Sequence, residues 1–384
     1  MNDLDFQQVA NIKVFGIGGG GCNAVNRMVA EGVKGVEFFV ANTDLQCLAK
    51  SPVENKLILG REITKGLGAG AVPEIGRRAA QESESEIREA IKGSDMVFIT
   101  AGLGGGTGTG AAPLFAKIAK EEGALTVGIV TKPFSFEGKK RMKSAEDGLA
   151  EMKEYVDSLI VVSNNNLIEV IGRRPLTEAF QAADNVLRQG VQTITDLIAI
   201  PALINLDFAD VRTVMENQGS ALIGIGMAEG EDKARVAAEK AIQSPLLETQ
   251  IRGARNAIVN ITGGESITLF DADDAMTSIR ESAGNEIDAI FGVAINEKLG
   301  DAVIVTVIAT GFDKEEKEED PMDKMFSYSK QPKKTEAVDL TPHGFTKKEE
   351  NYTATHAATH AKVNTQTTND DEHEGKIPNF FMSR

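Results

Sequence analysis

The first 160 residues alternate short apolar runs with segments of helical periodicity. Five runs are dominated by Val, Ile, Phe and Leu and indicate buried strands, at residues 12–17, 36–41, 96–100, 125–130 and 159–162. Between them, the spacing of apolar positions predicts helices at residues 23–31, 73–92, 111–121 and 140–155. This alternation predicts an α/β fold with a Rossmann-like parallel sheet, in which ligands bind at the carboxyl ends of the strands.

The pattern changes after a long helical segment at residues 176–200, whose apolar positions suit burial on more than one side. Beyond it we expect a smaller mixed α/β domain, with helices near 233–242 and 272–283. Its strands are predicted at residues 221–227, 257–262, 290–296 and 303–310. The long segment is therefore predicted to be a central helix that links two domains.

A polar stretch rich in Lys, Glu, Thr and Asn begins at Asp313 and predicts a disordered linker. The predicted organisation is an N-terminal tail, a nucleotide-binding domain, a central helix, a second domain, the linker and a C-terminal peptide. These parts span residues 1–10, 11–175, 176–200, 201–312, 313–375 and 376–384.

Composition narrows the classes of function. The net charge of −16 argues against a nucleic-acid partner, because phosphate contacts along a duplex need clustered Lys and Arg. All four histidines lie at or beyond His343, so a histidine triad or a His-ligated metal site is not expected in the folded part. The sequence has only two cysteines, and it contains neither an apolar run long enough to span a bilayer nor a signal peptide. We therefore expect a soluble protein of the reducing cytoplasm.

A glycine-rich segment follows the third predicted strand, with six glycines in the nine residues 102–110. Such a segment loses much backbone entropy on ordering, so it needs a compensating role. Its position between a buried strand and a helix start is typical of a loop whose backbone N–H groups hold phosphate. A flexible loop without a ligand is the alternative.

A second glycine-rich loop follows the first predicted strand. Gly16, Gly18 and Gly21 match G-x-G-x-x-G, and Asp44 follows the next strand, so an NAD-dependent oxidoreductase has to be weighed. One dinucleotide fingerprint does not explain a second glycine cluster, and the sequence holds no G-x-x-x-x-G-K-[ST] P-loop. Two glycine loops facing each other fit a nucleoside triphosphate better.

The order of these motifs resembles that of the tubulin-like GTPases, in particular the branch that acts in bacterial cell division. The resemblance covers about residues 11–312, and its motifs lie at residues 18–23, 42–44, 66–70, 104–110, 131–134 and 205–210. It implies a tubulin-like fold and a GTPase that binds GTP with Mg²⁺. It also implies head-to-tail filaments, a division ring at mid-cell, and contact with the membrane only through adaptors. A scaffold of this fold that does not hydrolyse GTP is a further alternative.

The resemblance also implies which residues contact the nucleotide. The first loop would line the α and β phosphates, the second loop the β and γ phosphates, and the remaining residues the sugar and base. The expected set is Gly19, Gly20, Gly21, Cys22, Asn23, Thr43, Gly105, Gly106, Thr107, Gly108, Glu137, Arg141, Asn164, Phe180 and Asp184. A carboxylate at Asp184 suits the N1–H and N2–H₂ donors of guanine and would meet an acceptor on adenine, so we expect ATP to be excluded.

Several of these positions also have a purely structural interpretation. Glu137 and Arg141 have the i, i+4 spacing of an exposed ion pair, and Phe180 could be a core residue on a buried helix. Cys22 stands where the family usually has Asn. Asn165 and Asn166 also depart from the usual family pattern, so they are left out of the expected site.

Two further carboxylates, Asp207 and Asp210, have the spacing of a capping box at the start of a helix. The resemblance assigns them a catalytic role instead, because in the family the equivalent pair reaches the γ-phosphate held by the next subunit. The two roles are compatible, since a capping carboxylate is held rigid.

The last nine residues end the polar linker with four apolar side chains, those of Ile377, Phe380, Phe381 and Met382. The resemblance implies a docking peptide for division adaptors and regulators. Deletion of residues 376–384 should leave GTP hydrolysis and filament formation nearly intact and abolish recruitment to adaptor-coated membranes. A truncated protein that loses GTPase activity, or binds adaptors as well as the full chain, would contradict this interpretation.

Overall fold

The computed structural model describes residues 10–172, 175–199, 207–244, 251–284 and 287–312. The predicted linker, the C-terminal docking peptide and most of the N-terminal tail lie outside these residues, as do Asn205 and Leu206 of the 205–210 motif.

A parallel sheet forms the first half of the described chain. Its strands are β1 (Ile12–Ile17), β2 (Glu37–Asn42), β3 (Asn55–Ile58), β4 (Met96–Gly102), β5 (Leu125–Lys132) and β6 (Ser158–Ser163). They lie in the order β3-β2-β1-β4-β5-β6, and all pair in parallel. Five were predicted from their apolar runs. Edge strand β3 was missed because it has four residues, two of them polar.

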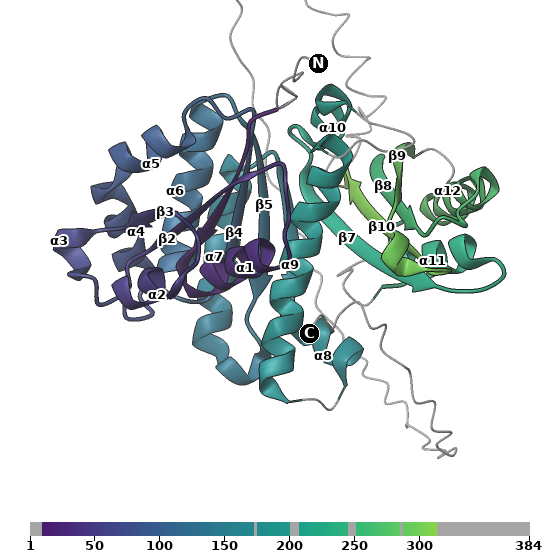
Figure 1. Cartoon of the computed structure of the whole chain (residues 1–384). Helices are drawn as coiled ribbons and strands as arrows, with labels where there is room; N and C mark the ends of the chain where they lie inside the picture. The colour runs from purple at the N-terminus through teal and green to yellow at the C-terminus, as the bar shows by residue number, and fades with distance from the viewer. Residues whose placement is uncertain (1–9, 173–174, 200–206, 245–250, 285–286, 313–384) are drawn as a thin grey trace, which may run out of the picture. The chain divides into compact units, whose positions relative to one another are not determined.

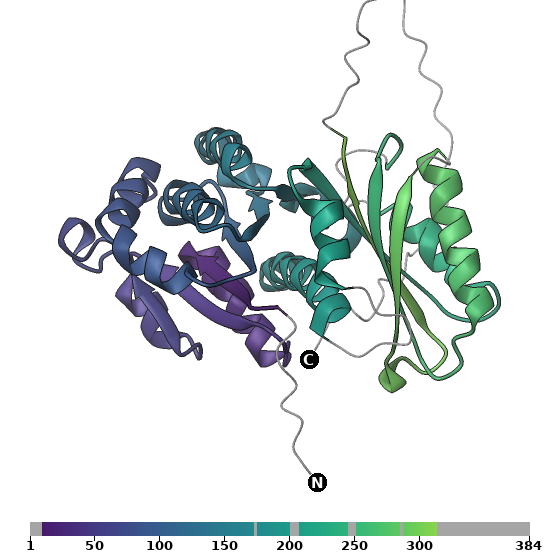
Figure 2. The same ribbon diagram turned by 90° about the horizontal axis from the view of Figure 1, so that it is seen from above.

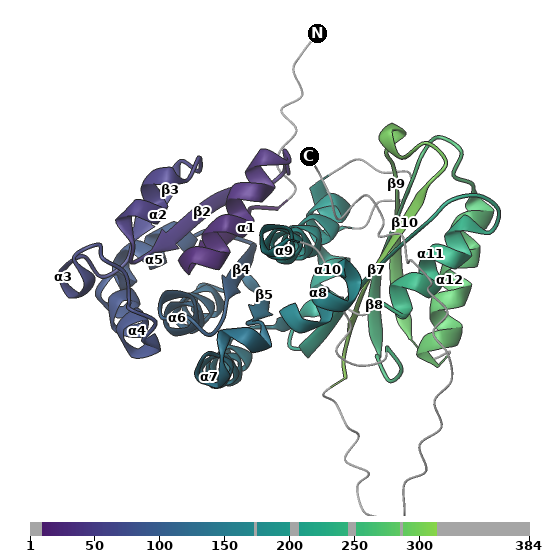
Figure 3. The same ribbon diagram turned by 90° about the horizontal axis from the view of Figure 1, so that it is seen from below.

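Helices cover both faces of this sheet. They are α1 (Gly18–Ala30), α2 (Leu45–Lys50), α3 (Arg61–Thr64), α4 (Pro73–Glu82), α5 (Glu84–Ile91), α6 (Thr107–Glu121), α7 (Lys139–Tyr155) and α8 (Asn164–Ile171). Alternate residues of β1 enter two cores: Ile12 and Val14 pack with α1, whereas Phe15 and Ile17 pack with α4 and α6. Figure 3 shows α1 on one side of the strands and α4, α6 and α7 on the other.

Two helices begin earlier than their periodicity predicted. α1 starts at Gly18 rather than at residue 23, and α6 starts at Thr107 rather than at residue 111, so the glycine-rich motifs form the first turns of these helices. Low intrinsic helix propensity is overridden here by close packing. The predicted helix at residues 73–92 is broken at Ser83 into α4 and α5.

The central helix α9 (Leu176–Ala199) leads to α10 (Phe208–Met215), β7 (Gly219–Ala228), α11 (Lys233–Ile242), β8 (Asn256–Gly263), α12 (Leu269–Ala283), β9 (Asp288–Ile295) and β10 (Val303–Thr310). Short 3₁₀ turns occupy Ser135–Glu137 (η1) and Glu297–Leu299 (η2). The second half is mixed, as predicted: β10 runs antiparallel to β7 and β8, and β8 and β9 are parallel. In Figure 1, α9 runs between the end of the molecule that carries α8 and the end that carries α10.

The two halves share one sheet. β7 continues the first half through three parallel pairs with β6, from Ser158↔Gly219 to Ile160↔Ala221, which completes the strand order β6-β7-β10-β8-β9. Figure 2 shows the second half of the described chain, in teal and green, beside the first, in purple and blue. Among the helices of the described residues, none is both long and apolar enough to cross a lipid bilayer.

Candidate functional site

Two helix N-termini meet at the carboxyl ends of adjacent strands. α1 follows β1 and α6 follows β4, and these strands pair directly. Neither helix has a side-chain cap or an acidic residue in its first turn, so the N-terminal N–H groups and both helix dipoles are available to an anion. A Cβ at Gly18 would lie 2.7 Å from the Gly108 nitrogen, which shows how closely the two backbones approach. This geometry suits phosphate.

The glycines of the two loops fall into two groups. A side chain would collide with backbone at Gly21, which faces the Thr100 carbonyl, and at Gly108, which faces the Gly102 carbonyl. A Cβ at Gly106 would likewise lie 2.7 Å from the Ala69 side chain. Packing alone explains these three glycines, whereas a Cβ at Gly20, which lines the cavity, would make only a tight contact of 3.2 Å with Gly102.

Gly19 and Gly105 belong to the second group. A Cβ at either position would meet nothing in the protein within 4 Å, and neither residue has the positive φ that disfavours side chains. The fold itself gives no reason for glycine at these two positions. A ligand in the open space beside them supplies the reason, because a phosphate there needs bare backbone.

Thr43 joins the end of β2 to this site. Its hydroxyl lies 2.6 Å from the Thr107 hydroxyl in a buried hydrogen bond, and its carbonyl accepts from the Gly68 nitrogen at 3.1 Å. Thr43 and Thr107 therefore hold the segment 66–70 and the first turn of α6 together.

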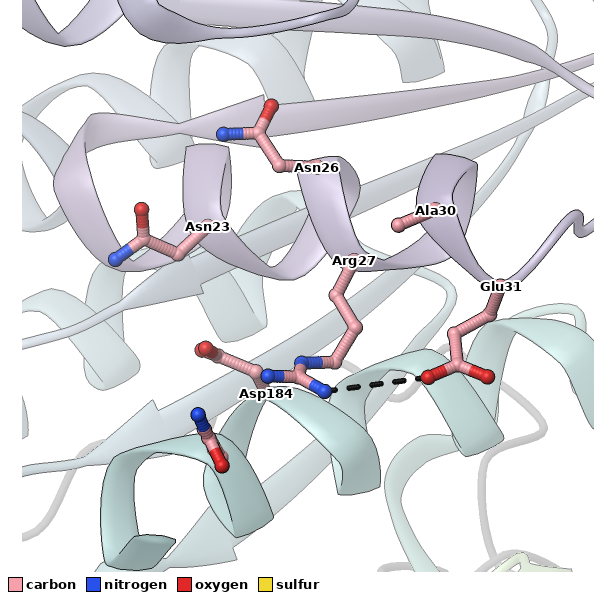
Figure 4. Close-up of a pocket in the computed structure, with 7 residues that line it drawn as sticks. Asn23, Asn26, Arg27, Ala30, Glu31 and Asp184 are labelled. Atoms are coloured by element: carbon pink, nitrogen blue, oxygen red, sulfur yellow. Dashed lines mark ion pairs between the residues drawn. The ribbon is translucent and has the colours of Figure 1, made fainter. Parts of the chain in front are cut away.

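A cavity of about 230 Å³ continues from the phosphate loops toward α9. It brings together seven of the sequence-predicted residues: Gly20, Asn23, Glu137, Arg141, Asn164, Phe180 and Asp184. A second cavity, of about 540 Å³, lies between α1 and α9 and shares Asn23 and Asp184 with the first. Figure 4 shows Asp184 beside Arg27, which pairs with Glu31.

Glu137 and Arg141 form the predicted ion pair, with 2.6 Å between Oε2 and Nη1. The pair is not a fully exposed one, because the Glu137 side chain is 12% exposed and also accepts from the Phe134 nitrogen. Arg141 is half-exposed at the cavity, so its guanidinium can contact a phosphate or sugar oxygen while Glu137 holds it in place.

Phe180 is not a core residue. Its side chain is 43% exposed at the cavity, and its ring contacts Phe134 edge to face at 5.4 Å. Phe134 is buried and stacks on Phe136. An exposed ring supported on one side can pack against a nucleobase on the other.

Asn164 supplies an unpaired acceptor. Its side-chain oxygen is buried without a hydrogen-bond partner in the protein, and the residue lines the cavity. A buried amide oxygen left unpaired costs about 1–3 kcal/mol, which a ligand donor can recover. The neighbouring Asn165, omitted from the sequence prediction, positions the site instead: its Oδ1 accepts from the Ser135 nitrogen at 2.9 Å and holds η1 beside the cavity.

Burial raises the pKa of Asp184 to about 7, although the nearby positive charge of Arg27 acts in the opposite direction. The carboxylate form is therefore costly in the protein without ligand. A ligand that donates hydrogen bonds to Asp184 would stabilise the ionised form.

The side chain of Cys22 faces the protein core. Its side chain is fully buried in the core shared by α1 and β2, and the thiol contacts the carbonyls of Gly16 and Ala41. Its backbone N–H lies in the fifth position of α1, beyond the first four N–H groups that a helix leaves unpaired, so neither group of Cys22 is placed to contact a nucleotide.

Asp207 and Asp210 do not reach this cavity. They form the predicted capping box of α10: Asp207 Oδ1 accepts from the Asp210 nitrogen at 2.8 Å, and Asp210 Oδ2 from the Asp207 nitrogen at 3.3 Å. Arg212 of the same helix donates to the carbonyl of Asp95, which precedes β4. The pair therefore lies at the amino ends of the parallel strands, opposite the cavity.

Comparisons with known proteins agree with this geometry. The model of the Tubulin/FtsZ family GTPase domain matches residues 11–172, and that of the FtsZ family C-terminal domain matches residues 219–313. An FtsZ dimer from M. jannaschii, described as empty, is 45% identical with a TM-score of 0.77, over 79% of this chain and 89% of that chain. The chain belongs to the FtsZ family.

A single-substitution mutant of M. jannaschii FtsZ gives similar values, with 45% identity and a TM-score of 0.76 over 79% of this chain and 91% of that chain. CetZ2 from Haloferax volcanii is 20% identical, with a TM-score of 0.69 over 83% of this chain and 98% of that chain, and shares the fold. As an FtsZ-family member the chain is a GTPase, which confirms the predicted fold and activity. The oxidoreductase alternative finds no support.

Replacing Asp184 by Asn should stabilise the protein and weaken GTP binding. The pKa of Asp184 is raised above its unfolded value of 3.8, so folding stability falls as pH rises from about 4 through 7. Asn removes this penalty, so the gain should be on the order of 4 kcal/mol at pH 8 and near zero at pH 4. Denaturant unfolding of the wild type and the variant at pH 8 and pH 4 measures this change in the free energy of unfolding.

Asp196→Asn is the matched control. This carboxyl lies on the same helix, is also partly buried, which raises its pKa to about 6, and lines neither cavity. It should stabilise the protein at pH 8 without changing the rise in melting temperature caused by GTP. ATP should give no such rise in the wild type. Equal protection by GTP in the Asp184→Asn variant would exclude Asp184 as a contact to the base.

Gly108→Ala should lower the stability of the fold, whereas Gly105→Ala should lower the affinity for GTP. A Cβ at Gly108 would lie 2.7 Å from the Gly102 carbonyl, so we expect a loss of about 1–3 kcal/mol of stability. A Cβ at Gly105 meets no protein atom, so that variant should keep its melting temperature and lose GTP affinity. Thermal unfolding with and without GTP separates the two effects, and unchanged affinity in Gly105→Ala would place the phosphates elsewhere.

Proposed function

We propose that this GTPase assembles head to tail into filaments and that Asp207 and Asp210 of one subunit complete the site that holds GTP in the next. The observation that supports the proposal is their position: the cavity lies at the carboxyl ends of the strands and the two carboxylates lie at the amino ends. Strand β4 alone, with seven residues, separates these ends by about 23 Å. Within one molecule the two carboxylates are too far away to act on bound GTP.

The length of the central helix gives a second measure of the distance between the nucleotide cavity and the two carboxylates. α9 has 24 residues and so is about 36 Å long, with Phe180 and Asp184 near its start and the segment leading to Asp207 at its end. A contact that joins one end of a subunit to the opposite end of the next uses two unlike surfaces. Such a heterologous contact repeats without closing and produces a filament.

The capping box gives the carboxylates the rigidity that catalysis needs. Each accepts a backbone N–H, which fixes its orientation, and both side chains remain exposed. In a neighbour's site, the free carboxylate oxygens would accept hydrogen bonds from a water molecule and orient it toward the γ-phosphate. Mg²⁺ would enter with the phosphates of GTP and offset their charge.

Large apolar side chains are exposed in both halves of the described chain. Leu67 is 85% exposed in the segment beside the phosphate loops, and Leu269 and Phe270 are 76% and 82% exposed at the start of α12. The latter two line an apolar cavity of about 300 Å³. Exposed apolar groups of this size favour contact with another protein surface. The M. jannaschii relative is described as a dimer, which also favours self-association.

We also propose that the filaments form the ring of bacterial cell division in the cytoplasm at mid-cell. The membrane contact would be indirect, through adaptors that bind residues 376–384. This role rests on membership of the FtsZ family.

The GTPase rate per molecule should depend on assembly. It should be negligible below a threshold protein concentration and rise above it, because each complete site needs two subunits. A rate per molecule that stays constant down to high dilution would exclude a shared site.

Asp210→Asn tests the carboxylate directly. Asp210 is the N3 residue of the capping box, and an Asn side-chain oxygen there can still accept from the Asp207 nitrogen, so the melting temperature should change little. When the variant is mixed with wild type, the GTPase rate per wild-type molecule should fall in proportion to the variant fraction, because sites next to a variant subunit lack Asp210. A site complete within one subunit would instead leave the wild-type rate unchanged.

A further inference from the structure

Helix α10 begins with the capping box described above, and its other end is held by two buried hydroxyl groups. Ser158 Oγ donates to the Met215 carbonyl at 2.6 Å, and Thr310 Oγ1 donates to the Val214 carbonyl at 2.8 Å. The side chains of Ser158 and Thr310 are both fully buried. Carbonyls in the last turn of a helix have no partner within the helix, so these two bonds satisfy groups that would otherwise be unpaired.

The two hydroxyls come from different halves of the described chain. Ser158 is the first residue of β6 in the first half, and Thr310 is the last residue of β10 in the second. Because β7 runs parallel to β6 and antiparallel to β10, both hydroxyls lie at the same edge of the sheet, where the parallel strands begin. The end of α10 is therefore fixed to both halves of the sheet.

Further contacts restrict the same end of the helix. The apolar face of α10, formed by Val211, Val214 and Met215, is buried in the core cluster shared by β6, β10 and α9. The segment that follows the helix is bound to Asp157, whose carbonyl accepts the backbone N–H groups of residues 218–219 at 2.9 Å. Because α10 has eight residues and is about 12 Å long, an orientation fixed at its end also fixes the position of its first turn.

The hydroxyls add a constraint that apolar packing does not supply. A buried hydroxyl costs free energy unless it is hydrogen-bonded, and an apolar side chain of similar size would fill the same space. Apolar burial holds a helix against a sheet but is not directional, whereas a hydrogen bond favours one geometry. Ser158 and Thr310 therefore fix the direction of α10 as well as its contact with the sheet.

We propose that Ser158 and Thr310 are positioning residues for GTP hydrolysis, because they hold α10 in the orientation that places Asp207 and Asp210 in the neighbouring subunit's site. The inference rests on the shared site proposed above. Without either hydroxyl, one carbonyl at the helix end loses its partner and α10 is free to tilt. A displacement of about 1 Å can slow a reaction by about 100-fold. The nucleotide cavity lies at the opposite ends of the strands, so GTP binding should be unaffected.

The first test compares full-length Ser158→Ala with the wild type. GTP should raise the melting temperature of both proteins equally and filaments should sediment equally, while the maximal GTPase rate per molecule falls about tenfold. Ser83→Ala is the matched control, because the Ser83 hydroxyl is also buried and donates to a carbonyl, that of Ile58, in the first half. This control should keep the wild-type rate. An unchanged rate in Ser158→Ala, or a rate that falls only with the loss of GTP binding or of filaments, would overturn the proposal.

Two variants of Thr310 separate the hydroxyl from the shape of the side chain. Thr310→Val keeps the branched shape and removes the donor, so its maximal rate should fall as in Ser158→Ala. Thr310→Ser keeps the donor and should keep the wild-type rate. Equal rates in the two variants would contradict a role for the hydroxyl. If Thr310→Val does not fold, Ser158→Ala decides.

A double variant shows whether the hydroxyls act through the carboxylates. Asp210→Asn should be slow by itself, and Ser158→Ala should not slow it further, because little is then left for the hydroxyl to position. A second, independent tenfold loss in the Asp210→Asn background would contradict the positioning role. A slow Asp210→Asn with an unaffected Ser158→Ala would refute this proposal alone. If Asp210→Asn keeps the wild-type rate, the proposed shared site fails, and the positioning role fails with it.

Discussion

The close approach of two helix N-termini is the contact on which the site depends. Gly18 and Gly108 let the backbones of α1 and α6 come together where β1 and β4 end, and a Cβ at Gly18 would lie 2.7 Å from the Gly108 nitrogen. Two sets of unpaired N–H groups and two helix dipoles then point into one space. The glycine-rich motifs are therefore first a packing device, and phosphate binding follows from that packing.

The cost of the site is visible in groups that the fold leaves unsatisfied. Asp184 is partly buried without a partner that fully compensates its charge, and the Asn164 side-chain oxygen is buried and unpaired. Both groups would destabilise a protein that binds no ligand, because buried polar groups need hydrogen-bond partners. A ligand that supplies the missing hydrogen bonds turns them into sources of specificity, so the site is less stable when empty than an apolar pocket would be.

The sheet separates the nucleotide cavity from the two carboxylates that we propose act on its GTP. Asp207 and Asp210 lie beyond the amino ends of strands whose carboxyl ends form the nucleotide cavity. No motion of side chains can close a gap set by the length of β4 and α9. The proposed active site would be a property of the contact between subunits, so hydrolysis and assembly would be linked by geometry.

The sequence by itself determined the fold class, because buried parallel strands such as 12–17 and 96–100 are continuous apolar runs and the helices between them are amphipathic. Its ordered motifs also determined the family, and with it the GTPase activity. Tertiary structure decided what depends on neighbours remote in sequence: that Phe180 is exposed, that the Cys22 thiol faces the core, and that glycine is unexplained by packing at Gly19 and Gly105. Tertiary structure also decided that β7 extends the first sheet by pairing with β6. The local sequence pattern predicts that a segment forms a strand, but it does not predict which other strand pairs with it.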